Sequence, residues 1–175
     1  MKADFINPFV AAGINVLGSV VNTRPEPGQL AVRSATFTTQ QVSIVIGVTG
    51  AVEGQVVYGM SLVTATKIAA AMSSMPTMTF DELASSAIAE LGNMISGNAT
   101  TLLSEAGYES QITPPTLVRG ADVEISTRTP ALVVPLYTDL GKMEINVALA
   151  ERSRRPPAAS ESPSDQLAEA GVTDS

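Results

Sequence analysis

The chain has 175 residues, carries a formal net charge of −7 and contains no His, Cys or Trp. Without His and Cys it cannot form a zinc finger, a disulfide framework, a Ser-His-Asp triad or a Cys-His dyad, and any metal site would need oxygen ligands alone. The acidic charge argues against nucleic-acid binding, which requires clustered Lys and Arg.

The first predicted element is a helix that Asn7 and Pro8 open, because Asn is a good N-cap and Pro is tolerated at the first helical position. Apolar residues recur at helical spacing over residues 9–21, and Pro and Gly residues at 24–28 end the helix. This apolar run is too short for a membrane span, and the acidic N-terminus is unlike a signal peptide. We therefore expect a cytoplasmic protein that does not insert into a membrane.

A β-hairpin is expected over residues 35–60, where Thr, Val, Ile and Phe are frequent and Gly50 and Gly54 flank a turn. The apolar spacing of residues 62–75 then predicts a helix that Pro76 ends.

A longer helix is expected from about residue 80 to residue 105. Thr79 and Glu82 match a capping box at its start, and Gly107 provides a stop signal at its end.

Three strands are expected after this helix, at residues 121–128, 131–138 and 142–149, with a tight hairpin at Leu140-Gly141. Pro114-Pro115 interrupts regular structure before them. This order of elements predicts an α+β fold in which one antiparallel sheet is packed against helices. The two hairpins on either side of a helix pair suggest an internal pseudo-repeat.

The domain is expected to span residues 1–150. Residues 151–175 are rich in Ala, Ser, Pro and acidic side chains, a composition that cannot bury enough apolar surface to offset the entropy of ordering. We therefore predict a disordered tail. Most of the acidic residues, twelve of 17, belong to the domain.

The long helix has two opposite faces when its residues are placed about 100° apart. One face is apolar and should pack on the sheet; its residues are Ala84, Ile88, Leu91, Ile95, Ala99 and Leu102. The other face should point outward; its residues are Ser86, Glu90, Asn93, Gly97 and Ser104.

Glu90 and Asn93 are neighbours on the outward face, three residues apart. A carboxylate can pair with a partner's Lys, and a carboxamide can hold a water in place, although it is not a strong base. Orienting an attacking water is what some phosphoryl-transfer sites require. Without further information, two such residues on an outer helix face are ordinarily solvated polar side chains, and their spacing alone does not indicate a site.

Segment 81–99 resembles the signature helix of the CheC/CheX/FliY chemotaxis phosphatases. The family pattern has Ser or Asp, Glu four residues later, Asn three residues after the Glu, and Pro about twenty residues further on. Ser86, Glu90, Asn93 and Pro114-Pro115 fit this pattern. Other segments are similar to the CheX branch, namely 6–9, 47–54 and 114–120, so the resemblance covers about residues 5–149.

The resemblance implies a protein phosphatase that hydrolyses the aspartyl phosphate of a CheY-type receiver domain. Glu90 would pair with the receiver's Lys and dock it, Asn93 would orient the attacking water, and Ser86 and Gly97 would contribute to partner binding. Mg²⁺ would lie in the receiver, so no metal or other cofactor is expected on this chain.

The resemblance also bears on assembly. CheX-like members carry a single motif and join sheet edges in a homodimer, which we therefore expect here. We interpret the helix at 62–72 as the counterpart of the signature helix, and it contains no Glu-x-x-Asn.

Two alternatives to the enzyme stay open. The first is a non-catalytic receiver-binding or scaffold module of a chemotaxis, flagellar or two-component system, against which the presence of both Glu90 and Asn93 counts. The second is a small-molecule-binding domain, which has little support because the sequence has no phosphate-binding Gly loop and no aromatic cluster.

Overall fold

The structure is a computed structural model that describes residues 3–76 and 79–153. In chain order its elements are α1 (Ala3–Val20), β1 (Glu26–Pro27), β2 (Ala31–Arg33), β3 (Thr36–Thr38), β4 (Val42–Gly50), β5 (Val52–Met60), α2 (Leu62–Met72), α3 (Glu82–Glu105), β6 (Ser110–Ile112), β7 (Thr116–Arg119), β8 (Glu124–Ser126), β9 (Ala131–Thr138) and β10 (Gly141–Glu151).

The main sheet has the strand order β1-β9-β10-β5-β4-β6, and β2 and β7 extend its edges by pairing with β9 and β4. All strand pairs between described residues are antiparallel. Two hairpins, β4–β5 and β9–β10, form the centre and join where Tyr58 of β5 lies opposite Ile145 of β10. β3 and β8 form a separate two-stranded ribbon. The predicted α+β class is confirmed.

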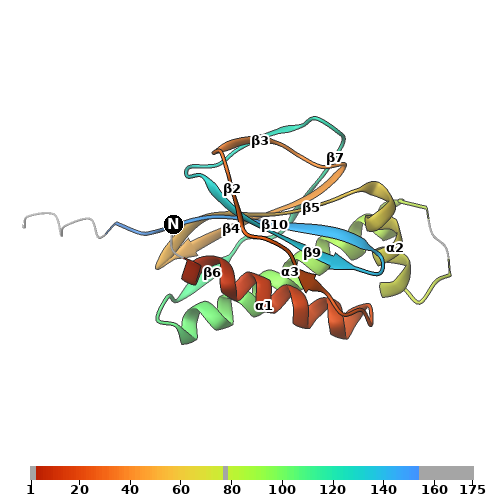
Figure 1. Cartoon of the computed structure of the whole chain (residues 1–175), viewed down its shortest axis with the longest axis horizontal. Helices are drawn as coiled ribbons and strands as arrows, with labels where there is room; N and C mark the ends of the chain where they lie inside the picture. Colours follow the sequence, from red (N-terminus) through yellow and green to blue (C-terminus); the bar gives the residue numbers. More distant parts are fainter. Residues whose placement is uncertain (1–2, 77–78, 154–175) are drawn as a thin grey trace, which may run out of the picture.

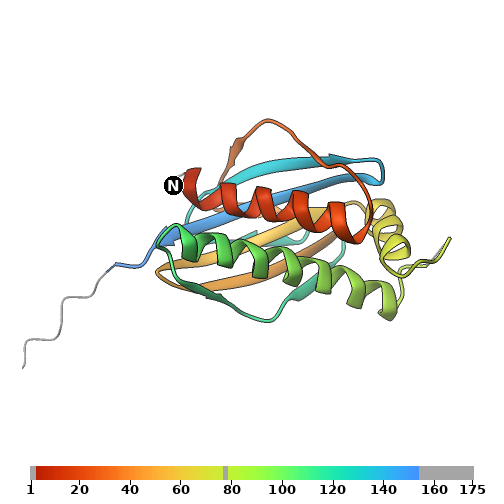
Figure 2. The same cartoon turned by 90° about the horizontal axis from the view of Figure 1, so that it is seen from below.

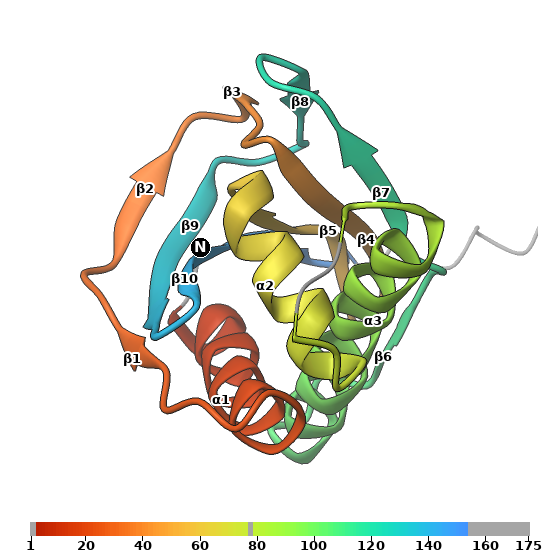
Figure 3. The same ribbon diagram turned by 90° about the vertical axis from the view of Figure 1, so that its right-hand side faces the viewer.

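Two helices cover one face of the sheet. α1 and α3 lie side by side across it (Figures 1 and 2), and α2 lies at one end (Figure 3). The strand residues that point towards the helices are buried because apolar side chains alternate along each strand. On β4 they are Val42, Ile44, Ile46 and Val48. One core thus forms between the sheet and the helix pair.

The chain is an interlocked pseudo-repeat, as the two hairpins suggested. The first half consists of α1, β1–β2, β3 and the β4–β5 hairpin; the second consists of α3, β6–β7, β8 and the β9–β10 hairpin. Strands of one half pair with strands of the other, because β2 pairs with β9, β7 with β4, β3 with β8 and β5 with β10. α1 is therefore the counterpart of α3, and α2 connects the halves. The interpretation of the helix at 62–72 as that counterpart is wrong.

α1 begins at Ala3, upstream of the predicted start, so Pro8 lies inside the helix. Pro8 cannot donate a helical hydrogen bond, which ordinarily destabilises a helix. Burial of Phe5 and Ile6, each 2% exposed, offsets this cost, and the Phe5 ring meets the Tyr108 ring edge to face at 5.1 Å between centroids.

By length and composition α1 could cross a bilayer. In this fold its apolar face instead packs on α3, β9 and β10. α1 is therefore a helix of the domain core.

The start of α3 also differs from the prediction. Its N-cap is Asp81, whose carboxylate accepts a hydrogen bond from the Ala84 N–H at 3.0 Å, and not Thr79. Leu103 replaces Leu102 as the last fully buried residue of the apolar face. The predicted stop is confirmed, because Gly107 has a φ of +93° just after the helix.

The alternation of apolar residues did not predict the short strands at the sheet edges. β1, β2, β6 and β7 are two to four residues long, too short to show alternation, and β1, β6 and β7 contain Pro or lie close to Pro114-Pro115. The strand expected at 121–128 shortens to β8, and the helix expected at 62–75 ends at Met72. β10 continues to Glu151, so the domain extends slightly past residue 150. The predicted tail lies beyond this point, and residues 154–175 are outside the described residues.

Candidate functional site

The outward face of α3 brings all four predicted site residues together. Ser86 and Glu90 are exposed, Asn93 and Gly97 are partly buried, and they follow one another at intervals of three or four residues along one side of the helix. The buried residues of α3 lie on the opposite side, and the helix contacts α1, α2, β4, β6 and β7. Packing of the apolar side therefore fixes which residues α3 presents to a partner.

Glu90 and Asn93 occupy the middle of this face. Neither side chain forms a hydrogen bond or ion pair with another described residue. The described part of α3 also contains no Lys or Arg that could neutralise Glu90. A carboxylate acceptor and a carboxamide, which both donates and accepts, are thus available to an external group.

Gly97 is not explained by contacts within the chain. A Cβ added there would meet nothing within 4 Å, and the residue does not have a positive φ. Gly inside a helix costs about 1 kcal/mol relative to Ala, so the fold alone would favour another residue. The glycine leaves a flat region one turn beyond Asn93, where another molecule can approach the helix closely.

The N-terminal end of the face is hollowed. An open depression of about 740 Å³ is lined by Asp81, Glu82, Leu83 and Ser86. Leu83 in this lining is 57% exposed. The outward face therefore extends about one turn before Ser86.

The turn before α3 is held by β7. Arg119 donates a hydrogen bond to the carbonyl of Phe80 at 3.0 Å, and its guanidinium lies 5.3 Å from the centre of the Phe80 ring. Pro114-Pro115 connects β6 to β7 along the edge next to α3, as predicted for a segment without regular structure. The contact between Arg119 and Phe80 fixes where α3 begins relative to the sheet.

The residues beneath Asn93 were not predicted from the sequence. Tyr58 of β5 and Ser96 of α3 form a hydrogen bond of 2.6 Å between their hydroxyl oxygens, and both residues are fully buried. Burial raises the pKa of the Tyr58 phenol well above its usual range, although the hydrogen bond to Ser96 acts in the opposite direction. The available signal was a Tyr at an inward position of β5 and a Ser on the apolar side of the helix, and neither is specific.

α1 lacks the site. Both helices contain two glycines five residues apart, Gly13 and Gly18 on α1 and Gly92 and Gly97 on α3. Aligning these pairs places Ala11 where α3 has Glu90, and Ile14 where α3 has Asn93. The Glu-Asn pair is therefore confined to one half of the pseudo-repeat.

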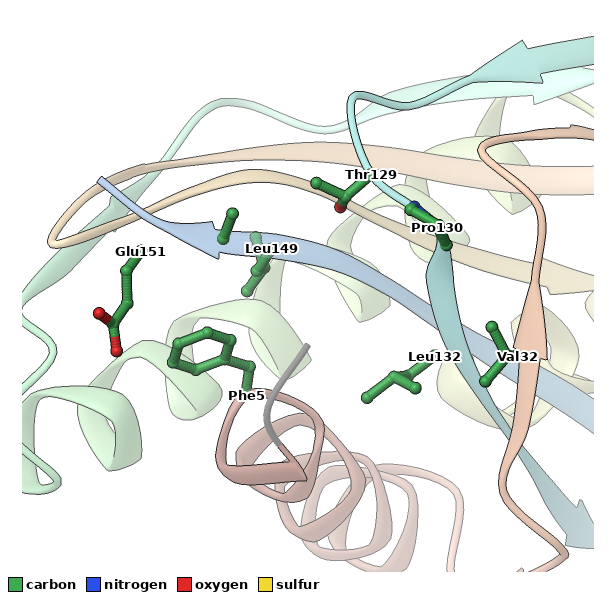
Figure 4. Close-up of a pocket in the computed structure, with 8 residues that line it drawn as sticks. Phe5, Val32, Thr129, Pro130, Leu132, Leu149 and Glu151 are labelled. Carbon is green, nitrogen blue, oxygen red and sulfur yellow. The ribbon is translucent and has the colours of Figure 1, made fainter. Parts of the chain in front are cut away.

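A separate cavity of about 750 Å³ opens where the start of α1 approaches β2 and the ends of β9 and β10 (Figure 4). Its lining residues are Phe5, Val32, Thr129, Pro130, Leu132, Leu149, Ala150 and Glu151. None of them belongs to α3, and the lining is mainly apolar. Across residues 3–76 and 79–153, no group of three acidic residues is placed to hold a metal ion.

The chemistry available on α3 is positioning. The Asn93 carboxamide is neither a nucleophile nor a strong base, and one carboxylate with one carboxamide is too few ligands for a metal site. Together these two groups can anchor a cation and orient a water, and a reaction partner must supply the remaining reactive groups.

Comparisons with known proteins identify the family of the chain. The family described as chemotaxis phosphatase CheX matches residues 42–137, which include α3. The CheY-P phosphatase CheX of Thermotoga maritima is 35% identical over 137 residues, 78% of this chain and 88% of the relative.

Solved structures share the fold. The chemotaxis protein CheX of Desulfovibrio desulfuricans has a TM-score of 0.75 and 28% identity, covering 85% of this chain and 99% of that chain. A chain of the CheX-CheY-BeF3-Mg complex of Borrelia burgdorferi has a TM-score of 0.68 and 28% identity, covering 86% of this chain and 100% of that chain.

Proposed function

Since the chain belongs to the CheX chemotaxis phosphatase family, we propose that it accelerates hydrolysis of the aspartyl phosphate on a CheY-type receiver domain. The observation that carries the proposal is the neighbouring pair of an exposed Glu90 and a partly buried Asn93 on the side of α3 opposite its buried residues. A relative of this fold is known in a complex with CheY, which supports a receiver as partner.

In the proposed reaction, the Glu90 carboxylate pairs with a receiver lysine and holds α3 across the receiver's phosphorylation site. The Asn93 carboxamide accepts a hydrogen bond from a water and holds the water oxygen in line with the phosphorus. The new P–O bond forms to this water as the P–O bond to the aspartyl oxygen breaks. The products are inorganic phosphate, which retains the water-derived oxygen, and a regenerated aspartate.

Such a catalyst needs neither His nor a metal of its own. Phosphoryl transfer depends mainly on geometry and electrostatic stabilisation, and no strong base is required. The receiver would contribute the acidic pocket and its Mg²⁺, while Ser86 and Gly97 would contact the receiver on either side of the Glu90–Asn93 pair.

We further propose a homodimer that joins sheet edges, in the cytoplasm. The edge segment that includes β2 carries two exposed apolar side chains, Leu30 at 49% and Val32 at 73% exposure. Such exposure on an edge strand favours pairing with another strand. Sedimentation equilibrium of the full chain tests the assembly; a monomer at tens of micromolar would contradict it.

Asn93→Ala tests the function. We expect phosphate release from a phosphorylated receiver to lose on the order of 100-fold in rate, because one orienting group for the transition state is removed. Receiver binding should change less than threefold, since Glu90 remains. The matched control is Asn98→Ala, which removes an exposed carboxamide of the same helix that bonds to the Met94 carbonyl.

The same measurements separate the enzyme from the scaffold. If the wild-type chain binds phosphorylated receivers and leaves their phosphate lifetime unchanged, the non-catalytic binding module is correct and the proposed reaction is wrong.

A further inference from the structure

The hydrogen bond between Tyr58 and Ser96 joins α3 to the middle of the sheet. Its oxygen–oxygen distance is 2.6 Å, and each residue is 0% exposed. Within residues 3–76 and 79–153, it is the side-chain hydrogen bond that links the body of α3 to a strand. A buried hydrogen bond of this length is directional, so it restrains α3 more specifically than apolar packing does.

The bond lies at the turn that carries Asn93. Gly92 and Ser96 are four residues apart and both face the sheet, and Asn93 directly follows Gly92. A Cβ added at Gly92 would lie 2.8 Å from the Ile44 Cγ2 atom and 3.5 Å from the Tyr58 Cδ2 atom. The helix therefore sits close to the sheet at this turn, and the Tyr58 ring lies beneath it.

Among the described residues, no side-chain hydrogen bond links α1 to a strand. The alignment of the glycine pairs places Leu17, a fully buried apolar residue, where α3 has Ser96. A Cβ at Gly13 would meet the side chains of Leu136 and Ile145, both apolar. Of the two corresponding helices, the one that carries the Glu-Asn pair is thus the one with a polar link to the sheet.

We propose that Tyr58 and Ser96 are positioning residues that fix the rotation of α3 and thereby the direction of the Asn93 carboxamide. This inference rests on the proposed function. Side-chain atoms lie roughly 5–6 Å from a helix axis, so a rotation of about 10° displaces them by about 1 Å. A displacement of this size can cost on the order of 100-fold in rate.

The two site residues should respond differently to such a rotation. Glu90 and a partner lysine are long and flexible, and an ion pair between them tolerates a small displacement. Asn93 is short and must direct one water, so its role does not tolerate the same displacement. Loss of the Tyr58–Ser96 bond should therefore lower kcat and leave KM nearly unchanged.

The test uses Tyr58→Phe, Ser96→Ala and the double variant in the full-length chain, with a phosphorylated receiver as substrate. Each single change leaves a buried hydroxyl without its partner and should destabilise the fold. The double change removes both hydroxyls, so no buried polar group is left unpaired and we expect little change in stability. We expect the double variant to regain a melting temperature near that of the wild type, with kcat still about 10-fold lower and KM within twofold.

The matched control is Ser43→Ala. Ser43 is 1% exposed on β4, and its hydroxyl has no partner among the described residues. This change should leave kcat and KM unaltered. The ¹⁵N–¹H signals of the Asn93 side chain should move or broaden in the double variant and stay in place in Ser43→Ala.

The outcomes are distinct. If the wild type is active and the stably folded double variant has the same kcat, the Tyr58–Ser96 pair is structural only and the positioning role is wrong. A raised KM with unchanged kcat would contradict it equally. A wild-type chain that does not shorten the phosphate lifetime would overturn the proposed function, and this inference with it.

Discussion

α1 and α3 occupy corresponding places in the two halves of the fold and lie side by side on the same face of the sheet (Figure 2), yet only α3 carries a Glu-Asn pair. Their sheet-facing sides are alike, since each places a glycine, Gly13 or Gly92, where a Cβ would collide with strand side chains. Their outward sides differ, because α1 has Ala11 and Ile14 at the positions of Glu90 and Asn93. Packing thus constrains one side of each helix and leaves the other able to acquire or lose a function.

The largest expected effect on the difference between α1 and α3 comes from Glu90→Lys. In the proposed complex this change places a positive charge opposite the receiver lysine, so we expect receiver affinity to fall on the order of 100-fold. Titration of the variant against a receiver with beryllofluoride and Mg²⁺ measures the effect. Glu105→Lys, at the exposed C-terminal end of the same helix, is the control and should bind as the wild type does. Unchanged affinity of Glu90→Lys would mean that the receiver docks elsewhere.

A smaller effect should distinguish Gly97 from its counterpart Gly18. Alanine at Gly97 would touch nothing in the chain, so Gly97→Ala should stabilise the free protein by about 0.5–1 kcal/mol. The added methyl group should nevertheless raise KM several-fold by obstructing close approach of the receiver. Gly18→Ala on α1 should give a comparable gain in stability and no change in KM, because α1 lacks the Glu-Asn pair proposed to bind the receiver.

Chemical denaturation together with receiver turnover assays provides both readouts. A Gly97→Ala variant that is more stable and equally active would remove Gly97 from the partner-binding face.

The smallest expected effect concerns the buried Tyr58–Ser96 hydrogen bond that joins α3 to β5. Burial raises the pKa of Tyr58 in the folded chain, whereas the phenol in the unfolded chain titrates near its ordinary value of about 10. Above that pH the unfolded chain releases this proton while the folded chain retains it, so the free energy of unfolding falls as pH rises. The stability advantage of the wild type over Tyr58→Phe should therefore be complete below about pH 10 and shrink above it. A difference that is constant from pH 8 to pH 11 would contradict the burial of this phenol.

The sequence was sufficient to predict the elements whose patterns are long. The α3 wheel separated Ile88, Leu91 and Ile95 from Glu90 and Asn93 because 24 residues sample the helical period several times. The two central hairpins were predictable for the same reason, since alternation and Gly turns reinforce each other. The outward face of α3 followed from this period, whereas the assignment of Glu90 and Asn93 as a site came from the resemblance of segment 81–99 to the CheC/CheX/FliY signature helix.

What local patterns could not show depends on distant contacts. Pro8 indicated a helix start, but burial of Phe5 and Ile6 extends α1 upstream of it. The pairing of α1 with α3 arises from the interlocked sheet and not from the order of helices along the chain. The Tyr58–Ser96 bond joins residues 38 positions apart, and a Ser on the apolar side of a helix does not indicate its partner.

The central claim is that the outward face of α3 catalyses loss of phosphate from a receiver. The most direct test is the lifetime of the aspartyl phosphate on receivers from the same organism, measured with and without the wild-type chain at saturating concentration. We expect at least one receiver to lose its phosphate tenfold faster or more, with the acceleration absent in Asn93→Ala. Receivers that bind the chain and keep an unchanged phosphate lifetime would contradict the claim.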